Sequence, residues 1–471
     1  MEVFWVRRGA QLSFAAGFYA FPGGAVDPAD SAIPVAGAQG ADAAFRVAAA
    51  RELFEETGVL RAEGADKLPA SELPHLRRLL LDGKASFAEI LSKHGLRLSA
   101  DHFRAAGRWI TPPFMPTRFD ARFFLLEMPA WADAELWPGE HAEGGWIRPL
   151  DALRCWEEGT ALLHPPNLHA IRTLARHANE DEIAEQLRSP RYCTEFVVEL
   201  IEFQQGIRIF PLRTPTLPPA THTNCYLVGN GELVIIDPGA ADSSEVERLL
   251  SFLSALRTDG LSPAAVFLTH HHIDHIGGAA AIKQRLKIPV WCHERTADRL
   301  PFRADRLFSD GEPLDVKGSP PMRFIILHTP GHARGHLCLV DQRSRAAIVG
   351  DMVAGLGTIV IDPPEGDMGD YLAQLLRLKE LPVRALYPAH GPVIPNGTAK
   401  LAEYLAHRVQ REQMVLEAIR AGDGTVADIV RRAYQDVSEL MHPVAERSTQ
   451  AILIKLLREG TISRQGDRYA A

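Results

Sequence analysis

Cysteine is scarce in this sequence, and the few cysteines present form no recognisable redox or zinc motif. The chain has 471 residues and 5 cysteines. No two of them are spaced as C-x-x-C and their number is odd, so we expect buried, reduced thiols rather than a disulfide framework. The five positions are Cys155, Cys193, Cys225, Cys292 and Cys338.

Long apolar runs and an excess of positive charge are also missing. No stretch approaches the roughly 20 apolar residues of a membrane-spanning helix, and residues 1–10 lack the apolar core of a signal peptide. The net charge is -8, which gives no global electrostatic reason to expect nucleic acid. With 46% hydrophobic and 23% charged residues the chain is typical of globular proteins. We therefore expect a soluble cytoplasmic enzyme, without a membrane partner, of roughly three domains.

What the sequence does contain is a cluster of histidines at residues 269–275, directly after the apolar run 264–268. The run predicts a short buried strand, which places the polar side chains on the loop at its C-terminal end. His270 and His272 are two residues apart and can reach one ion, while the following Asp-His pair can face a second. Imidazole and carboxylate ligands suit zinc or a similar divalent metal. The alternative is a surface histidine cluster without a metal.

Four more apolar runs in the second half of the chain each lead into a residue that can bind a metal or orient its ligands. These residues are Asp237, His332, Asp351 and His390. Together with residues 270–275, the order H-x-H-x-D-H, then H, D and H, resembles the metallo-β-lactamase superfamily over about residues 207–398. Zinc β-lactamases carry a cysteine ligand at the position of Asp351, so the resemblance points instead to the glyoxalase II and ribonuclease branches.

The resemblance implies a role for each of these side chains. One metal ion would be held by His270, His272 and His332. The other would be held by Asp274, His275 and His390. Asp351 would bridge the two ions, and Asp237 would orient the histidine loop as outer-shell partners commonly do.

Two Zn²⁺ or similar divalent ions roughly 3.5–4 Å apart can lower the pKa of a shared water towards about 7. The bridging hydroxide would then attack a small ester, thioester or phosphate substrate. We expect Asp274 to orient this nucleophile as well as to bind metal. His336 is a candidate substrate contact or proton donor, and the alternative is a packed or surface histidine.

The N-terminal third places three glutamates on one face of a predicted helix over residues 45–57, which Gly58 terminates. Glu52, Glu55 and Glu56 are spaced i, i+3, i+4, so their carboxylates share that face. Like charges this close favour a hard cation such as Mg²⁺. The alternative is an exposed acidic helix face.

Residues 51–59 resemble the Nudix hydrolase motif, and Gly24 and Asp30 match its opening glycine and its first acidic position. The segment between Asp30 and Arg51 is longer than in the usual motif, as in Nudix enzymes that act on coenzyme A and its acyl derivatives. The resemblance implies Mg²⁺ or Mn²⁺ at the three glutamates, catalytic roles for Glu55 and Glu56, and diphosphate hydrolysis. The alternative is a module kept for packing or nucleotide sensing. The chain begins in the second half of the expected first strand, and a truncated start would weaken that sheet.

The tail beyond residue 398 is predicted to form helices over residues 399–421, 426–434 and 446–459, followed by a small hairpin. This order resembles the winged-helix tail of the lactamase-β-like ribonucleases, and residues 407–413 match their H-R-x-x-R-E-Q stretch. That family cuts single-stranded RNA. From residue 401 onward acidic and basic residues are equal in number, so charge does not favour RNA. The first helix could instead roof a small-molecule pocket, with His407 and Arg408 as substrate contacts.

We therefore expect a multi-domain α/β protein. Its parts are a Nudix α/β/α domain over residues 1–155, a helical extension over 156–206, a metallo-β-lactamase αββα sandwich over 207–398 and a winged-helix-like tail over 399–471. The predicted function is dinuclear metal-dependent hydrolysis of a small molecule such as an acyl-coenzyme A or nucleotide derivative, with a Nudix half that hydrolyses a nucleoside diphosphate derivative. The alternatives are an RNA endonuclease with an accessory Nudix module, and a binding protein with an inactive one.

Overall fold

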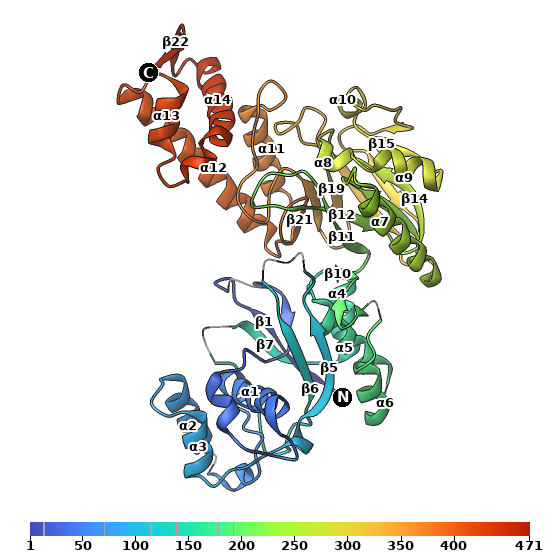
Figure 1. The fold of residues 1–471 in the computed structure, drawn as a ribbon, viewed down its shortest axis with the longest axis vertical. Coiled ribbons are helices and arrows are strands. Elements are labelled where there is room, and N and C mark those ends of the chain that lie inside the picture. The colour runs from blue at the N-terminus through green and yellow to red at the C-terminus, as the bar shows by residue number, and fades with distance from the viewer. Residues whose placement is uncertain are drawn as a thin grey trace. The chain divides into compact units, whose positions relative to one another are not determined.

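The chain forms two compact units, Met1–Gln204 and Gln205–Ala471, in the computed structural model (Figure 1). The boundary between them lies next to Gly206. The structure describes all residues except Ser13, Phe14, Ala70, Phe114, Pro116, Pro138, Glu140, Ala178 and Tyr192, and of Glu180 it describes the backbone alone.

The first unit is organised around helix α1 (Gly40–Thr57), which carries the three glutamates (Figure 1). The helix begins five residues before the predicted start and ends as predicted, with Gly58 in the left-handed conformation at φ 75°. Its buried residues, Phe54 among them, form a core with helices α2 (Glu72–Leu81) and α3 (Phe87–Lys93).

Besides the two-stranded pair β3 (Val35–Ala36) and β4 (Leu98–Ser99), this unit contains two larger sheets and three further helices. One sheet has the order β2-β1-β7, with strands Tyr19–Ala20, Val3–Arg8 and His141–Ile147. The other has the order β6-β5-β9-β8, with strands Asp120–Leu125, Arg104–Ile110, Val197–Val198 and Cys193–Thr194. The helices are α4 (Pro149–Glu157), α5 (Pro165–Arg176) and α6 (Glu180–Leu187). Pro165 and Pro166 open α5, because proline lacks only an N–H that has no partner in the first turn.

The second unit contains two mixed sheets (Figure 1), and most of their strands, though not the exposed pair Arg306–Leu307, are largely buried. The first includes, in order, β11 (Ile207–Arg213), β12 (His222–Val228), β13 (Glu232–Ile236), β14 (Ser262–Phe267), β15 (Val290–Cys292) and β16 (Arg306–Leu307). The second runs β17 (Pro313–Val316), β18 (Met322–His328), β19 (Leu337–Asp341), β20 (Ala347–Gly350) and β21 (Leu386–Pro388). Helices α7 (Ser243–Leu256), α9 (Ala279–Leu286) and α11 (Met368–Glu380) complete the layers.

The tail consists of α12 (Gly397–Arg420), α13 (Val426–Ala433), α14 (His442–Arg458) and the hairpin β22 (Ser463–Gln465) and β23 (Arg468–Ala470), all close to the predicted ranges. One continuous apolar core joins this tail to the second sheet. It contains Val349 of β20, Tyr371 of α11, Tyr404 of α12 and Leu453 of α14. The tail therefore packs as a part of the second unit rather than as a separate body.

Candidate metal centre

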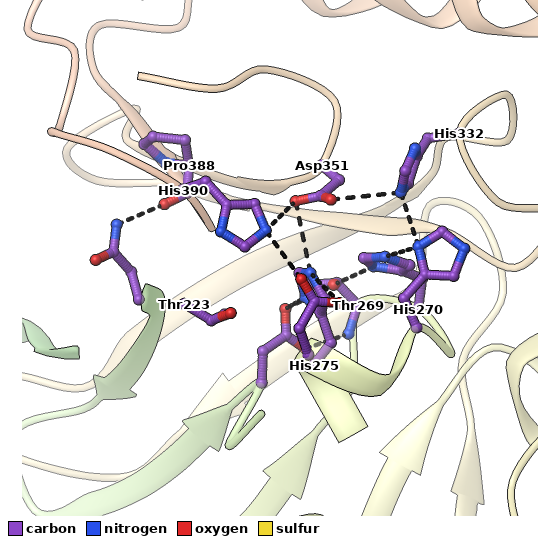
Figure 2. A network of polar contacts seen from close by, with 12 residues as sticks. Thr223, Thr269, His270, His275, His332, Asp351, Pro388 and His390 are labelled. Carbon is purple, nitrogen blue, oxygen red and sulfur yellow. Dashed lines mark hydrogen bonds and ion pairs between the residues drawn. The ribbon is translucent and has the colours of Figure 1, made fainter. Parts of the chain in front are cut away.

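The histidine-rich loop connects β14 to the short helix α8 (Ile273–Ile276) (Figure 2). The ends of β18, β20 and β21 bring His332, Asp351 and His390 to the same place. Strand pairs β13–β14 and β20–β21 are parallel, so their carboxyl ends meet at one edge of each sheet. This topology gathers side chains that are up to 120 residues apart in the sequence.

The first group of ligand atoms comes from His270, His272, His332 and Asp351, and all four atoms lie within 4.8 Å of one another. Nδ1 of His272 lies 3.0 Å from Nε2 of both His270 and His332. One carboxylate oxygen of Asp351, Oδ2, lies 3.4 Å from Nε2 of His332. Three imidazoles and one carboxylate form a donor set that suits zinc.

The second group comes from Asp274, His275 and His390, whose ligand atoms also lie within 4.8 Å of one another. Nε2 of His390 is 3.4 Å from Oδ2 of Asp274 and 3.4 Å from Oδ1 of Asp351. The same Oδ1 lies 3.6 Å from Nε2 of His275. Asp351 thus turns one oxygen towards each group.

Two atoms of this centre support the fit to a metal. Oδ1 of Asp351 and Nε2 of His275 are both buried, and neither has a hydrogen-bond partner within the described part of the chain. Such an unsatisfied buried acceptor is costly, and a cation would satisfy it. The donor types, their burial and their convergence on a common space therefore fit a pair of divalent ions.

The ionisation of the centre also fits metal binding. Burial, together with neighbouring histidines, lowers the pKa of His270 well below its ordinary value, so its ring is neutral with a free lone pair. Burial opposes ionisation of Asp351, but His390 and His275 outweigh it and hold the pKa of this carboxyl well below its usual range. Burial likewise opposes a proton on His275, but Asp351 and Asp237 outweigh it and raise the pKa of its ring. A divalent cation would take the place of that proton.

Asp237 holds the histidine loop, as its predicted role requires. It follows β13 with φ 50°, a left-handed conformation that a non-glycine residue rarely adopts. Its Oδ1 accepts a hydrogen bond from the Thr269 amide at 2.8 Å, and its Oδ2 accepts one from the Thr269 hydroxyl at 2.6 Å. Oδ2 also lies 2.9 Å from Nδ1 of His275, which directs Nε2 of that ring towards the centre.

Backbone carbonyls orient two further ligand rings. Nδ1 of His332 donates to the Val360 carbonyl at 2.8 Å, and Nδ1 of His390 donates to the His222 carbonyl at 3.0 Å. Such outer contacts fix which ring nitrogen faces the metal. We did not predict Val360 or His222, and no sequence signal could have found them, because every residue type offers a carbonyl.

His336 does not occupy the place of a substrate contact. The residue is fully buried, its Nδ1 lies 2.8 Å from the Thr329 hydroxyl, and its Nε2 accepts a hydrogen bond from the Asp351 amide at 3.0 Å. Both ring nitrogens are therefore occupied by the protein itself, which disagrees with the hypothesis of a substrate contact or proton donor. The alternative of a packed histidine describes its environment.

A cavity of about 820 Å³ adjoins the loop before His332. The tail contributes Ala451, Ile454 and Arg458 of α14 to its wall. The alternative that the first tail helix roofs a small-molecule pocket, with His407 and Arg408 as substrate contacts, is not met at this cavity, because neither residue lines it.

The arginines of the H-R-x-x-R-E-Q stretch are used inside the fold. Arg408 is buried, donates to the Ile359 carbonyl and lies over the ring of Tyr371 at 5.2 Å. Arg411 forms a two-point ion pair with Asp436 at 2.9 and 2.8 Å and also donates to the Ala433 carbonyl. Both arginines thus connect α12 to neighbouring segments of the second unit.

The three glutamates of α1 have different partners. Arg51 lies between carboxylates, with Asp30 at 3.0 Å, Glu52 at 2.7 Å and Glu55 at 3.1 Å. Burial, as the largest cause, raises the pKa of Glu52 to about 7 and also raises that of Glu55. Gly24 packs against the Glu52 carboxyl so closely that a Cβ would lie 2.4 Å from it.

Glu56 is turned to other contacts. It accepts a hydrogen bond from the Gly23 amide at 3.0 Å and lies 3.0 Å from Nε2 of the buried His141. Arg51 therefore bridges Glu52 and Glu55, whereas Glu56 pairs separately with His141. Among the residues that the structure describes, the groups whose ligand atoms converge for a metal both lie in the second unit. We missed His141, because a single histidine outside any motif carries no signal.

Models of three domain families match the chain. They are the metallo-beta-lactamase superfamily over residues 218–390, the beta-lactamase associated winged helix domain over 425–470 and the NUDT19 Nudix domain over 34–174. The Nudix match begins after Gly24 and Asp30 and ends beyond residue 155.

Curated relatives match about half of this chain. A beta-lactamase-like protein 2 homolog of Caenorhabditis elegans is 30% identical over 246 residues, which are 51% of this chain and 80% of that protein. The atrochrysone carboxyl ACP thioesterase of Aspergillus chevalieri is 33% identical over 247 residues, 50% of this chain and 75% of that enzyme. A beta-lactamase domain protein from Burkholderia ambifaria shares the fold, with a TM-score of 0.50 at 20% identity over 58% of this chain and 94% of that structure. No helix within the described residues is long and apolar enough to span a membrane.

Proposed function

We propose that this chain, which belongs to the metallo-β-lactamase superfamily, uses two divalent metal ions in its second unit to hydrolyse a small thioester or ester. The observation that carries the proposal is the position of Asp351. Its two oxygens face two separate groups of ligands, at 3.4 Å from His332 on one side and 3.4 Å from His390 on the other. A structural zinc site is closed by four ligands around one ion and has no use for a second group.

The chemistry that a pair of such ions supplies is a nucleophilic water at neutral pH and polarisation of the scissile carbonyl. The protein supplies the arrangement. Asp237 and the two backbone carbonyls direct the imidazoles, so the ligands need little reorganisation. Asp274 is the more exposed carboxylate of the centre, at 14% against 10% for Asp351, and we assign to it the role of accepting a proton from the attacking water.

The substrate class follows from two separate observations. The relative from Aspergillus chevalieri is named as a thioesterase of an acyl carrier protein. The first unit resembles Nudix enzymes of the coenzyme A type and matches a Nudix model. An acyl-coenzyme A contains both a thioester and a diphosphate. The second unit would hydrolyse the thioester and the first unit would hydrolyse the diphosphate.

Hydrolysis of the diphosphate would involve the α1 glutamates with Mg²⁺ or Mn²⁺. Arg51 bridges Glu52 and Glu55 without a metal, so an ion must compete with its guanidinium for these carboxylates. Glu55 is the more accessible of the two, at 23% against 15%, and we assign the catalytic role to it. Glu56, paired with His141, would complete the site after a rotation of its side chain.

RNA cleavage is the second candidate function, because the tail matches a winged-helix model. The contacts of the tail argue against it. Arg408 and Arg411, the basic residues of the family stretch, are 4% and 5% exposed and engaged within the fold. A phosphate backbone needs accessible positive charge.

The test is a hydrolysis panel on the zinc- and magnesium-loaded protein with acyl-coenzyme A, a simple thioester, a nucleoside diphosphate derivative and short single-stranded RNA. Asp351→Asn should abolish thioester hydrolysis and leave diphosphate hydrolysis intact. Glu55→Gln should do the opposite. Wild-type protein that cleaves RNA and leaves thioesters untouched would replace the proposal by the second candidate, and loss of both reactions in either variant would contradict the division between units.

A further inference from the structure

The backbone amide of Asp351 donates to the buried imidazole of His336, which is not a member of either ligand group. Nε2 of His336 accepts the hydrogen bond of the Asp351 backbone amide at 3.0 Å. An imidazole nitrogen that accepts carries no proton, so the proton of this neutral ring lies on Nδ1 and is donated to the Thr329 hydroxyl at 2.8 Å. The contact acts on the backbone of Asp351, and its carboxylate stays free to face both groups.

Contacts with Thr329 further restrict the position of the His336 ring. Thr329 and His336 are connected a second time, since the Thr329 amide donates to the His336 carbonyl at 2.9 Å. Both side chains are fully buried. The Thr329 hydroxyl also contacts Sγ of Cys338 at 3.3 Å. The imidazole is therefore fixed at both nitrogens and by its own backbone.

Gly350 joins this contact to the network of Asp237. It has φ 46°, and a Cβ at this position would lie 2.6 Å from Nε2 of His336 and 3.0 Å from the hydroxyl of Thr269. The Thr269 hydroxyl is the group that donates to Asp237. The glycine lets the backbone pass between the imidazole that holds Asp351 and the threonine that holds the histidine loop.

We propose that His336 is a positioning residue for Asp351: by accepting the Asp351 amide hydrogen bond, it sets where the carboxylate stands between the two ligand groups. This inference rests on the proposed metal centre, and it assigns a role to a residue that touches neither substrate nor metal. Loss of the acceptor leaves a buried amide without a partner and lets the turn at residues 350–351 shift. Outer contacts of this kind typically change metal affinity or activity about 10- to 100-fold.

Two substitutions of nearly equal size separate the two ring nitrogens. His336→Gln can place its side-chain oxygen where Nε2 stands and keep the acceptor for the Asp351 amide. His336→Asn can reach only the position of Nδ1, so it keeps the contact with Thr329 and loses the acceptor. A residue that merely fills space would respond to both changes alike.

The first readout is metal affinity, measured by competition of a chelator for Zn²⁺ with each full-length protein. We expect His336→Gln to stay within about threefold of wild type and His336→Asn to bind at least one equivalent about 10-fold or more weakly. Co²⁺ in place of zinc gives a second signal, because its visible absorption changes with ligand geometry. Equal affinities and spectra in the two variants would overturn the proposal, as would a wild-type chain that binds no zinc.

The second readout is turnover of the thioester. We expect His336→Asn to lower kcat with little change in KM, because the residue contacts no substrate, and His336→Gln to restore most of the loss. If wild type hydrolyses no member of the panel while the two variants still differ in zinc affinity, the proposed reaction fails and the positioning role stands. Should His336→Asn not fold, His336→Leu is the second variant without an acceptor for the Asp351 amide, and the proposal requires it to weaken zinc binding while Thr329→Val, which keeps Nε2 of His336, stays near wild type.

Discussion

The carboxylate of Asp237 lies 2.9 Å from Nδ1 of His275, and both residues are buried beneath the histidine loop. The same carboxylate accepts two hydrogen bonds from Thr269, the residue before the first histidine of the cluster. One side chain at the end of β13 thereby positions both ends of the loop that follows β14. The following predictions test how the centre and the parts around it depend on such contacts.

Replacement of Asp237 by asparagine should weaken metal binding at the Asp274–His275–His390 group. An amide in place of the carboxylate has one acceptor oxygen for three donors, so either Thr269 or His275 loses its partner. We expect an affinity about 10- to 100-fold lower, measured by zinc competition. The matched control is Asp341→Asn. Asp341 is equally buried in the same unit but holds only the turn at Ser344, so this variant should lose stability and keep its zinc affinity. Equal losses in both variants would contradict the assignment.

Replacement of Glu52 by glutamine should change how the stability of the first unit depends on pH. Burial raises the pKa of Glu52 from 4.5 to about 7, so between these values the folded state holds a proton that the unfolded state has lost. Stability of the wild type therefore falls as pH rises through this window, by about 3 kcal/mol at most from this group. Glu52→Gln lacks this loss, so its advantage over wild type should be absent near pH 4.5 and complete above pH 7.

The measurement is urea unfolding followed by tryptophan fluorescence. Of the seven tryptophans only Trp291 lies beyond Gln204, so the signal reports mainly the first unit. The exposed Glu63 provides the control, because Glu63→Gln should leave the pH profile unchanged. Mg²⁺ should flatten the profile of the wild type if it binds Glu52. A Glu52→Gln profile parallel to that of the wild type would show that Glu52 does not titrate in this range.

Removal of zinc should lower the thermal stability of the second unit. We expect the native state to bind ions that the unfolded state, which lacks the assembled centre, does not bind. Bound metal then adds about 2.7 kcal/mol when its free concentration is 100 times the dissociation constant. Calorimetry with and without chelator should show a fall in Tm that added Zn²⁺ reverses. In Asp351→Asn the fall should be smaller, because the shared ligand is gone. A Tm that is the same with and without chelator would mean that the centre holds no metal.

Arg411→Ala should destabilise the second unit without a specific effect on RNA. The side chain is 6% exposed, pairs with Asp436 at two points and lies 4.2 Å over the ring of Tyr434. Loss of charged hydrogen bonds and of this packing should cost about 2–3 kcal/mol in chemical unfolding. Asp436→Asn is the matched partner change and should cost about 1 kcal/mol or less, because that carboxylate is 59% exposed. Unchanged stability with weaker RNA binding would instead make Arg411 an RNA contact.

Short apolar runs and a helix-ending glycine predicted the position of several strands and of one helix end. The apolar runs before the histidine loop and before His332 form β14 and β18, and Gly58 ends α1 as its position indicates. Pro165 and Pro166, which begin α5, show that a proline pair has more than one structural meaning. A proline pair can separate two helices or begin one, and the choice depends on whether the following residues bury a common face.

The spacing predicted that Glu52, Glu55 and Glu56 share a helix face, but it could not show which groups their carboxylates contact. Arg51 reaches between two of them and His141 takes the third. Helical geometry fixes where a side chain starts, and its partners across the fold decide where its charged end lies.

The sequence by itself determined the family, the order of the domains and the residue types that can bind metal, because apolar periodicity and ligand chemistry are properties of residues and their spacing. Only the tertiary structure decided that Asp351 turns one oxygen to each ligand group, that His336 stands behind it with both nitrogens engaged, and that the tail shares the core of the second sheet. The physical reason is that these relations depend on backbone amides and carbonyls and on close packing between distant segments. Every residue offers such groups, so their use is decided only when the chain folds.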